Sequence, residues 1–245
     1  MIPLFKSHYS IGKSILTLKG KGSSIKNGPQ SIIDLCLEND IQDMYLVDDS
    51  MSGFLEGYLN SKEVNLNFRF GLRISVCDDL EEKSEEALHK TSKVVIFANT
   101  QQGYKSLIKL YTIAAQKGFY YEPRIDYKNL AKLWSDKDLT LMIPFYDSFL
   151  HKNAMCGGVC VPDFKFTKPV FAVEENDVPF NFLIEEDIKS YANQTFEIQK
   201  TKSIYYKNKD DFKAYLTFRC INNRTSLDKP NLDHMTSDEF CLEAL

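Results

Sequence analysis

The sequence has no apolar run close to the roughly 20 residues that a membrane-spanning helix needs. Its first ten residues, MIPLFKSHYS, lack the basic start and the long apolar core of a signal peptide. The six cysteines are scattered along the chain, which favours a reducing compartment over a disulfide framework. These absences predict a cytoplasmic protein that makes no membrane contact.

A strong excess of charge of one sign is also missing. The 245 residues include 30 Lys and Arg against 34 Asp and Glu, for a net charge of −4. A mildly acidic chain has little long-range attraction for phosphates, so autonomous, phosphate-driven DNA binding is not expected. The sequence also has no Gly-rich phosphate loop and no G-x-S-x-G nucleophile turn. Composition alone therefore indicates an ordinary globular protein and no particular activity.

Apolar runs alternate with amphipathic stretches through the first 150 residues, which favours an α/β fold over a bundle or a sandwich. The expected strands are Ile2–Phe5, Met44–Val47, Phe68–Val76, Lys93–Ala98 and Leu139–Ile143. The expected helices are Ile32–Leu37, capped by Ser31, then Met51–Leu59 and Gly103–Gln116. The acidic segment 78–89 is expected to form a solvated loop or a short helix.

The pattern is weaker after residue 150. Strands are predicted at Phe164–Val173 and Asn181–Ile184, and helices at Glu185–Asn193 and Asp210–Ile221. No internal repeat and no low-complexity linker interrupts the chain, so we expect one domain over residues 1–245.

Two groups of residues have spacings compatible with metal binding. Asp48 and Asp49 follow a predicted strand, where they could hold a divalent cation or cap the next helix, and spacing alone favours the cap. Cys156 and Cys160 lie within metal-ligand spacing with His151 nearby. Because zinc normally takes four nitrogen or sulfur ligands, two free thiols are the simpler interpretation.

A long ordered match connects the segment Gly103–Leu130 with a known family. Its sequence, GYKSLIKLYTIAAQKGFYYEPRIDYKNL, closely resembles the PHP (polymerase and histidinol phosphatase) domain of bacterial DNA polymerase III alpha subunits. The features shared with that domain are Ala98-Asn99 at a strand end, Gly103-Tyr104, Gly118–Tyr121 and the turn Pro123–Asp126.

Three further segments are similar to the same domain. Ser7–Ser10 resembles its entry turn, Val47–Gly53 its Thr-Asp-His-Gly-Asn-x-x-Gly turn, and Asp210–Ile221 with Pro230–Glu243 its closing stretch before the polymerase palm. The resemblance is weakest between residues 147 and 200. We interpret the chain as a diverged, phage-like or bacterial relative, which ends near the point where the palm would begin.

The resemblance implies a distorted (β/α)7 barrel in a single domain, and in active members a trinuclear metal centre that hydrolyses phosphoesters. The positions that correspond to the family's ligands are Leu4, Lys6, Lys13, Asp48, Asp49, Arg73, Ser92, Tyr146, Lys202 and Ile204. Four of these ten positions carry a cationic side chain.

Cationic side chains at ligand positions argue against a metal centre. Two unit charges about 4 Å apart repel by about 4 kcal/mol at an effective dielectric of 20, and Lys and Arg offer no lone pair to a metal. We therefore predict no metal cofactor, and we expect the cations to pair with Asp48 and Asp49.

The predicted function is that of a pseudoenzyme, a catalytically inactive structural part of a DNA polymerase III alpha subunit. The implied partners are the polymerase thumb and palm and a 3′–5′ exonuclease subunit, with DNA reached only indirectly. One alternative is an active phosphoesterase or proofreading exonuclease with Zn, Mn or Mg, for which the donors would be Asp48, Asp49, His8, His151, Cys156 and Cys160. Another alternative is an anion- or DNA-binding module that uses the emptied metal pocket.

Overall fold

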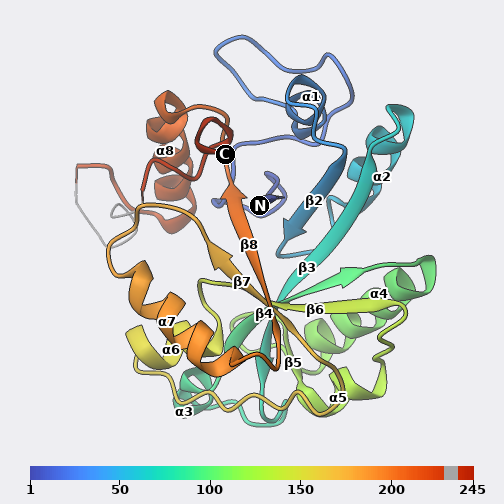
Figure 1. The fold of residues 1–245 in the computed structure, drawn as a ribbon, viewed down its shortest axis with the longest axis vertical. Helices are drawn as coiled ribbons and strands as arrows, with labels where there is room; N and C mark the ends of the chain where they lie inside the picture. The colour runs from blue at the N-terminus through green and yellow to red at the C-terminus, as the bar shows by residue number, and fades with distance from the viewer. Residues whose placement is uncertain (229–236) are drawn as a thin grey trace. The chain divides into compact units, whose positions relative to one another are not determined.

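The computed structural model describes residues 1–228 and 237–245 (Figure 1). The strands are β1 (Ile2–Phe5), β2 (Asp43–Asp48), β3 (Asn67–Cys77), β4 (Ser92–Ala98), β5 (Arg124–Asp126), β6 (Leu139–Ile143), β7 (Val170–Glu174) and β8 (Glu197–Ile204). The α-helices are α1 (Ile32–Glu38), α2 (Phe54–Glu63), α3 (Glu85–His89), α4 (Gln101–Gln116), α5 (Tyr127–Lys132), α6 (Phe149–Met155), α7 (Asn181–Ala192) and α8 (Phe212–Asn223). Short 3-10 helices cover Lys209–Asp211 and Leu242–Ala244.

Hydrogen bonds join the strands in the order β2-β1-β8-β7-β6-β4-β3-β5, and β2 also pairs with β3. The second pairing closes a ring of seven strands, with β5 attached to β3 outside the ring. Pairing is parallel at β1–β2, β1–β8, β3–β5 and β6–β7, and antiparallel at β3–β4 and β4–β6. The predicted α/β barrel of the PHP type is confirmed by this closed ring.

The chain divides into two compact units. The first contains Met1–Phe70, Glu174–Pro179 and Thr201–Leu245, and the second contains Gly71–Val173 and Phe180–Lys200. Strands β3 and β8 each continue from one unit into the other.

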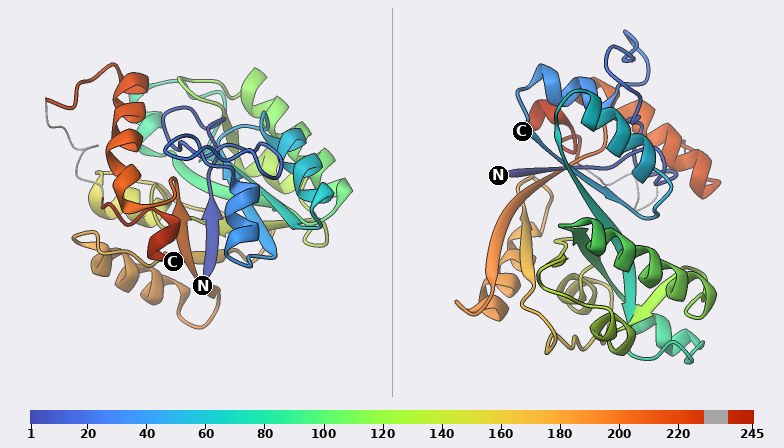
Figure 2. Two further views of the ribbon diagram at one scale, coloured as in Figure 1. Left: turned by 90° about the horizontal axis from the view of Figure 1, so that it is seen from above. Right: turned by 90° about the vertical axis from the view of Figure 1, so that its right-hand side faces the viewer.

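The first unit is built around β1. Leu4 and Phe5 of β1 lie opposite Tyr45 and Leu46 of β2 in parallel register. On its other side β1 pairs with the end of β8, and Figure 2 shows these two strands next to each other and pointing the same way. Parallel pairing brings the carboxyl ends of β1, β2 and β8 to one edge of the sheet, where loop residues can meet.

The second unit is built around β4, which runs antiparallel to both β3 and β6. The strand sequence SKVVIFA is buried along most of its length. Helix α4 packs against β4 and β5, with Leu107, Leu110 and Ala114 buried on one face. The Thr100 side chain caps this helix by accepting a hydrogen bond from the Gly103 N–H.

Most elements predicted from periodicity in the first 150 residues are confirmed, with shifts of a few residues at their ends. Helix α2 begins at Phe54, later than the predicted start, because Gly53 is its N-cap. Within the acidic segment, a short helix forms over Glu85–His89.

The predictions after residue 150 need correction. The expected strand Asn181–Ile184 is the first turn of helix α7, because Ile184, Ile188 and Ala192 recur at helical spacing and are buried. The expected strand over residues 164–173 begins only at Val170. The last helix is confirmed over Phe212–Asn223, while residues 229–236, within the predicted closing stretch, lie outside the described residues.

Within residues 1–228 and 237–245, no helix combines the length and the apolarity that crossing a bilayer requires.

Candidate functional site

The loop after β1 folds around the carboxylate of Asp48, at the end of β2. The Asp48 side chain is fully buried and accepts hydrogen bonds from the Ser7 N–H at 2.9 Å, the Ser7 Oγ at 2.6 Å and the Ser10 Oγ at 2.8 Å. The Ser10 Oγ in turn accepts from the Asp49 N–H at 3.0 Å. Asp48 is therefore an anchor for the entry turn and does not cap α2.

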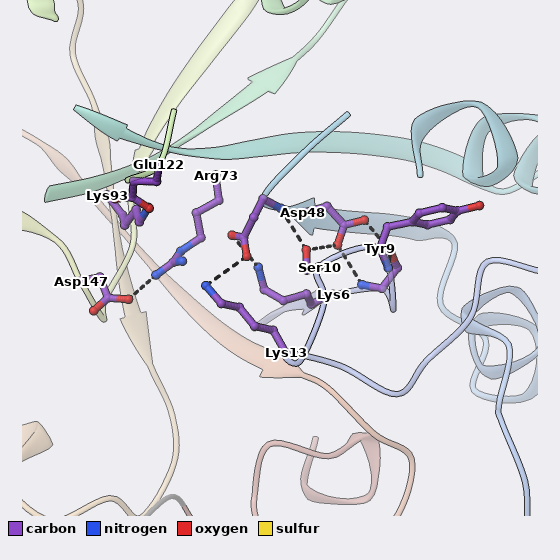
Figure 3. A network of polar contacts seen from close by, with 11 residues as sticks. Lys6, Tyr9, Ser10, Lys13, Asp48, Arg73, Lys93, Glu122 and Asp147 are labelled. Carbon is purple, nitrogen blue, oxygen red and sulfur yellow. Dashed lines mark hydrogen bonds and ion pairs between the residues drawn. The ribbon is translucent and has the colours of Figure 1, made fainter. Parts of the chain in front are cut away.

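Asp49 carries the ion pairs of the first unit's candidate site. Its Oδ1 lies 3.2 Å from the Lys6 Nζ and its Oδ2 lies 3.1 Å from the Lys13 Nζ. Figure 3 shows the Lys6 and Lys13 side chains lying next to each other, with dashed lines that mark these two ion pairs. The Lys6 side chain is only 7% exposed, whereas that of Lys13 is 48% exposed. The predicted pairing of cations with Asp49 is thus present, and Asp48 is held by hydroxyl and amide donors instead.

The turn after Asp49 is packed closely against the entry loop. A Cβ atom at Gly53 would lie 2.8 Å from a ring carbon of Tyr9 and 2.9 Å from a methyl carbon of Leu18. The Tyr9 hydroxyl donates to Glu56 at 2.7 Å, and this bond raises the pKa of Tyr9. A larger residue at position 53 would therefore displace the Tyr9 or the Leu18 side chain.

A buried carboxylate, which the sequence did not single out, lies beside the ligand positions on β8, Lys202 and Ile204. Glu174, at the end of β7, is buried and accepts hydrogen bonds from the Ser203 N–H and Oγ and from the Thr201 hydroxyl. Burial raises its pKa to about 7. Lys202 is also buried, and its Nζ donates to the Glu175 carbonyl at 2.7 Å and lies 4.0 Å from Glu239. The expected pairing of Lys202 with Asp48 or Asp49 is therefore wrong.

The second unit holds the remaining cationic position, Arg73 on β3. Its guanidinium forms an ion pair with Asp147, which follows β6 (Figure 3). Directly along the same strand, the Ser75 hydroxyl donates to Glu122, and Lys93 of β4 pairs with that same carboxylate. Ser75 and Lys93 are opposite each other in the β3–β4 register, so the strand pairing brings these groups together.

The uncharged ligand positions provide no new donor cluster. Leu4 and Ile204 are buried apolar residues at the ends of β1 and β8. Ser92 is buried at the start of β4, and the Tyr146 hydroxyl exchanges hydrogen bonds with Asn181, at 3.2 and 3.0 Å. None of these four positions offers the carboxylate, imidazole or thiolate that the family's ligands would supply.

The donors at these positions do not fit a trinuclear metal centre. The two lysines that face Asp49 bring protonated amines, which have no lone pair for a cation. Among the described residues, no three His, Cys, Asp or Glu side chains form a group that could hold a metal ion. Of the two carboxylates at these positions, Asp49 is engaged by the lysines and Asp48 by the hydrogen bonds from Ser7 and Ser10.

The donors of the alternative, relocated metal site are used elsewhere. The Cys160 thiol donates to the backbone carbonyls of His89 and Thr91, at 3.5 and 3.3 Å, and Cys156 is exposed. His151 lies on α6 with its ring edge-on to Tyr146, and burial lowers its pKa. In the described parts of the chain, no three of these donors form a group that could hold a metal ion.

The sequence did not single out three acidic residues that bind side chains of the strands described above, namely Glu122, Asp147 and Glu174. Glu174 is the last residue of β7, Asp147 follows β6 and Glu122 precedes β5, and each finds its partner on a strand distant in sequence. The only available signal was an isolated acidic residue after an apolar run, which is too common to be specific.

Comparison with known proteins agrees with the barrel fold. Residues 26–205 match the PHP domain family. DNA polymerase III subunit alpha of Borreliella burgdorferi is 23% identical over 183 residues, which are 66% of this chain and 15% of that protein. The corresponding subunit of Aquifex aeolicus is 49% identical over 39 residues, which are 16% of this chain and 3% of that protein. The matches thus span a small part of both relatives, whereas the family match covers most of the chain. The chain belongs to the PHP domain family.

Proposed function

We propose that this chain is a PHP domain without a metal centre, and that it serves as a structural and interaction part of a DNA polymerase III alpha subunit. The observation that carries the proposal is the pair of lysine amines, from Lys6 and Lys13, on the single carboxylate of Asp49. A phosphoesterase site of the kind that the resemblance implies uses metal-bound water, and metal ions would have to displace both amines from that carboxylate.

The polymerase context rests on relatives that carry the name DNA polymerase III subunit alpha. By the resemblance, the partners are the polymerase thumb and palm and a 3′–5′ exonuclease subunit. Nucleotidyl transfer then belongs to the palm, and a cytoplasmic location accompanies this role.

Metal content and nuclease activity test the inactive state. We expect atomic emission of the purified chain to find no stoichiometric zinc, manganese or magnesium. We also expect no chelator-sensitive cleavage of single-stranded DNA in Mn²⁺ or Mg²⁺. Stoichiometric bound metal together with chelator-sensitive cleavage would overturn the proposal.

The structural role needs a separate measurement. The chain is mixed with the palm and thumb of a polymerase III alpha subunit from the same source, and co-elution is followed by size-exclusion chromatography. A stable complex is expected, and separate elution at micromolar concentration would count against a scaffold.

The geometry favours this role over an anion-binding pocket at the same place. Lys6 and Lys13 share one carboxylate, which reduces the positive charge available to an outside anion. Salt-dependent DNA binding that weakens in Lys6→Glu and Arg73→Glu would reverse this preference.

A further inference from the structure

A cavity in the second unit has not been assigned a role by the proposed function. It has a volume of about 690 Å³ and lies where β6, β7 and β8 begin. This volume is within the range of small-molecule sites, about 300–1,000 Å³. Its lining includes three aromatic rings, two lysines and three threonines, namely Phe164, Phe166, Phe196, Lys165, Lys168, Thr140, Thr167 and Thr195.

The segment before β7 alternates aromatic and basic residues. It reads Phe164-Lys165-Phe166-Thr167-Lys168, and all five residues line the cavity. Interleaved rings and cations are the combination with which proteins hold single-stranded nucleic acids, because rings stack on bases and cations meet phosphates. The residues that carry this pattern thus also line the cavity, where a ligand could reach them.

The aromatic rings are held in position by neighbours. Phe166 packs edge-on to Trp134, with ring centroids 5.2 Å apart, and Phe164 lies 6.5 Å from Phe196 in the same manner. All three phenylalanines remain partly exposed. A base entering the cavity would therefore meet rings that need little ordering, which reduces the entropic cost of binding.

Two lysines and two carboxylates lie at or next to the cavity, so its local charge is close to balanced. The Lys165 side chain is 92% exposed and lies 3.8 Å from Asp163, and Lys168 is exposed. Among the described lining residues the single carboxylate is that of Asp136, which already accepts hydrogen bonds from the Trp134 indole and the Thr167 hydroxyl. A phosphate would therefore share Lys165 with Asp163, and charge contributes less to binding than the rings do.

We propose that this cavity binds one nucleotide of single-stranded DNA, with its base against Phe164, Phe166 and Phe196 and its phosphate near Lys165 and Lys168. A free mononucleotide offers the same base and phosphate, so the test includes both. This direct contact with DNA goes beyond the scaffold role. It uses residues other than those that form the ion pairs of Asp49, Asp147 and Glu122.

Stacking must supply most of the affinity, because the chain as a whole carries a charge of −4. One phosphate contact to a single strand predicts that log K falls with log salt with a slope of about −0.7. A shallow salt dependence therefore accompanies this mode of binding.

The single tryptophan of the chain provides the readout, because Trp134 packs on Phe166 at the cavity. The intact chain is titrated at low salt with an oligothymidylate of about 12 nucleotides and, separately, with thymidine monophosphate. Trp134 fluorescence follows both ligands, and anisotropy follows the labelled strand. A saturable change with the oligonucleotide is expected. A change with the monophosphate as well would identify the single nucleotide as sufficient.

Matched variants test the two parts of the site. The double variant Lys165→Glu/Lys168→Glu is expected to weaken oligonucleotide binding by at least about tenfold, while Lys105→Glu/Lys109→Glu, exposed on α4, leaves binding unchanged. Phe166→Leu is expected to weaken binding by about tenfold, since stacking on one ring is lost. Its control is Phe119→Leu, an exposed ring that does not line the cavity.

Circular dichroism melts establish that each variant is folded before binding is measured. No saturable response to either ligand at low salt would overturn the proposal. Equal weakening in the cavity variants and their controls would overturn it as well, because binding would then be a property of the general surface.

Discussion

At the residue scale, the carboxylate of Asp48, at the end of β2, accepts the hydrogen bonds that fix the entry turn, Ser7–Ser10. Three donors from Ser7 and Ser10 converge on its fully buried carboxylate. In Asp48→Ala these donors lose their acceptor inside the protein, so we expect the free energy of unfolding to fall by about 2–5 kcal/mol. Denaturant unfolding measures this change.

The control for this variant is Asp187→Ala on the exposed side of α7, which should change stability by less than about 0.5 kcal/mol. Asp48→Asn, which retains one acceptor oxygen, should fall between the two. An unfolding curve of Asp48→Ala that matches the parent would contradict the anchoring role.

The raised pKa of Glu174 predicts an unusual pH dependence. Burial raises the pKa of this carboxyl from 4.5 to about 7, so between these values the folded state holds a proton that the unfolded state has lost. The contribution of Glu174 to stability therefore falls as pH rises from about 4.5 to 7, by up to about 3 kcal/mol.

Glu174→Gln keeps a neutral side chain and removes this titration. We expect the free energy of unfolding of Glu174→Gln relative to the parent to increase steadily between pH 5 and 8. Chemical denaturation across that range measures the difference, with the exposed neighbour Glu175→Gln as control. A pH-independent difference would show that Glu174 does not titrate in this window.

Sequence reasoning found part of the polar network for a physical reason. Lys6, Lys13 and Asp49 lie in turns whose motifs are continuous in sequence, so their meeting could be expected. Glu174 and Glu122 were missed because each finds its partner through strand register, which depends on the closed sheet as a whole.

At the scale of elements, helix α4 lies unusually close to the neighbouring backbone. A Cβ atom at Gly103 would lie 2.1 Å from the Asp138 carbonyl oxygen, and one at Gly118 would lie 2.0 Å from the Arg124 carbonyl oxygen. Glycine at these two positions thus permits both ends of the helix to contact backbone.

Gly103→Ala tests this close packing. In an open helix the change would stabilise by up to about 1 kcal/mol, because alanine has the higher helix propensity. Here the added methyl group meets fixed backbone, so we expect the melting temperature to decrease instead. Gln102→Ala, at an exposed neighbouring position, should leave it nearly unchanged, and a melting temperature raised by Gly103→Ala would refute the contact.

Periodicity failed at two elements after residue 150, for two different reasons. Strand β8 has the sequence EIQKTKSI, and its buried residues include Thr201 and Lys202, so no apolar alternation marks it. The start of helix α7 was predicted as a strand, because three consecutive apolar residues there resemble a short strand. Burial of polar side chains by tertiary partners is invisible to a pattern of hydropathy.

At the scale of the whole molecule, the long resemblance predicted the barrel better than local patterns could. Parallel β1, β2 and β8 come from opposite ends of the chain, and no local signal specifies that pairing. The division into two compact units was not predicted, since no linker marks it in the sequence.

Continuity of strands predicts that the two units unfold together. β3 pairs through Asn67 with the residue before β2, and through Gly71–Val76 with β4, so one uninterrupted strand belongs to both units. Loss of structure in the first unit removes hydrogen bonds from one half of β3, and the other half then lacks a fixed end. Asp48→Ala, a change in the first unit, should therefore lower the melting midpoint reported by Trp134 in the second unit by several degrees, about 2–4 °C for each kcal/mol lost.

Simultaneous far-UV circular dichroism and Trp134 fluorescence on the same melt measure this coupling. Coincident midpoints in the parent and in Asp48→Ala are expected, because a transition shared by both units has one midpoint for all probes. If the Trp134 midpoint remained at the parent value while the circular dichroism signal gained an earlier transition, the units would unfold independently, and the shared strands would not transmit stability between them.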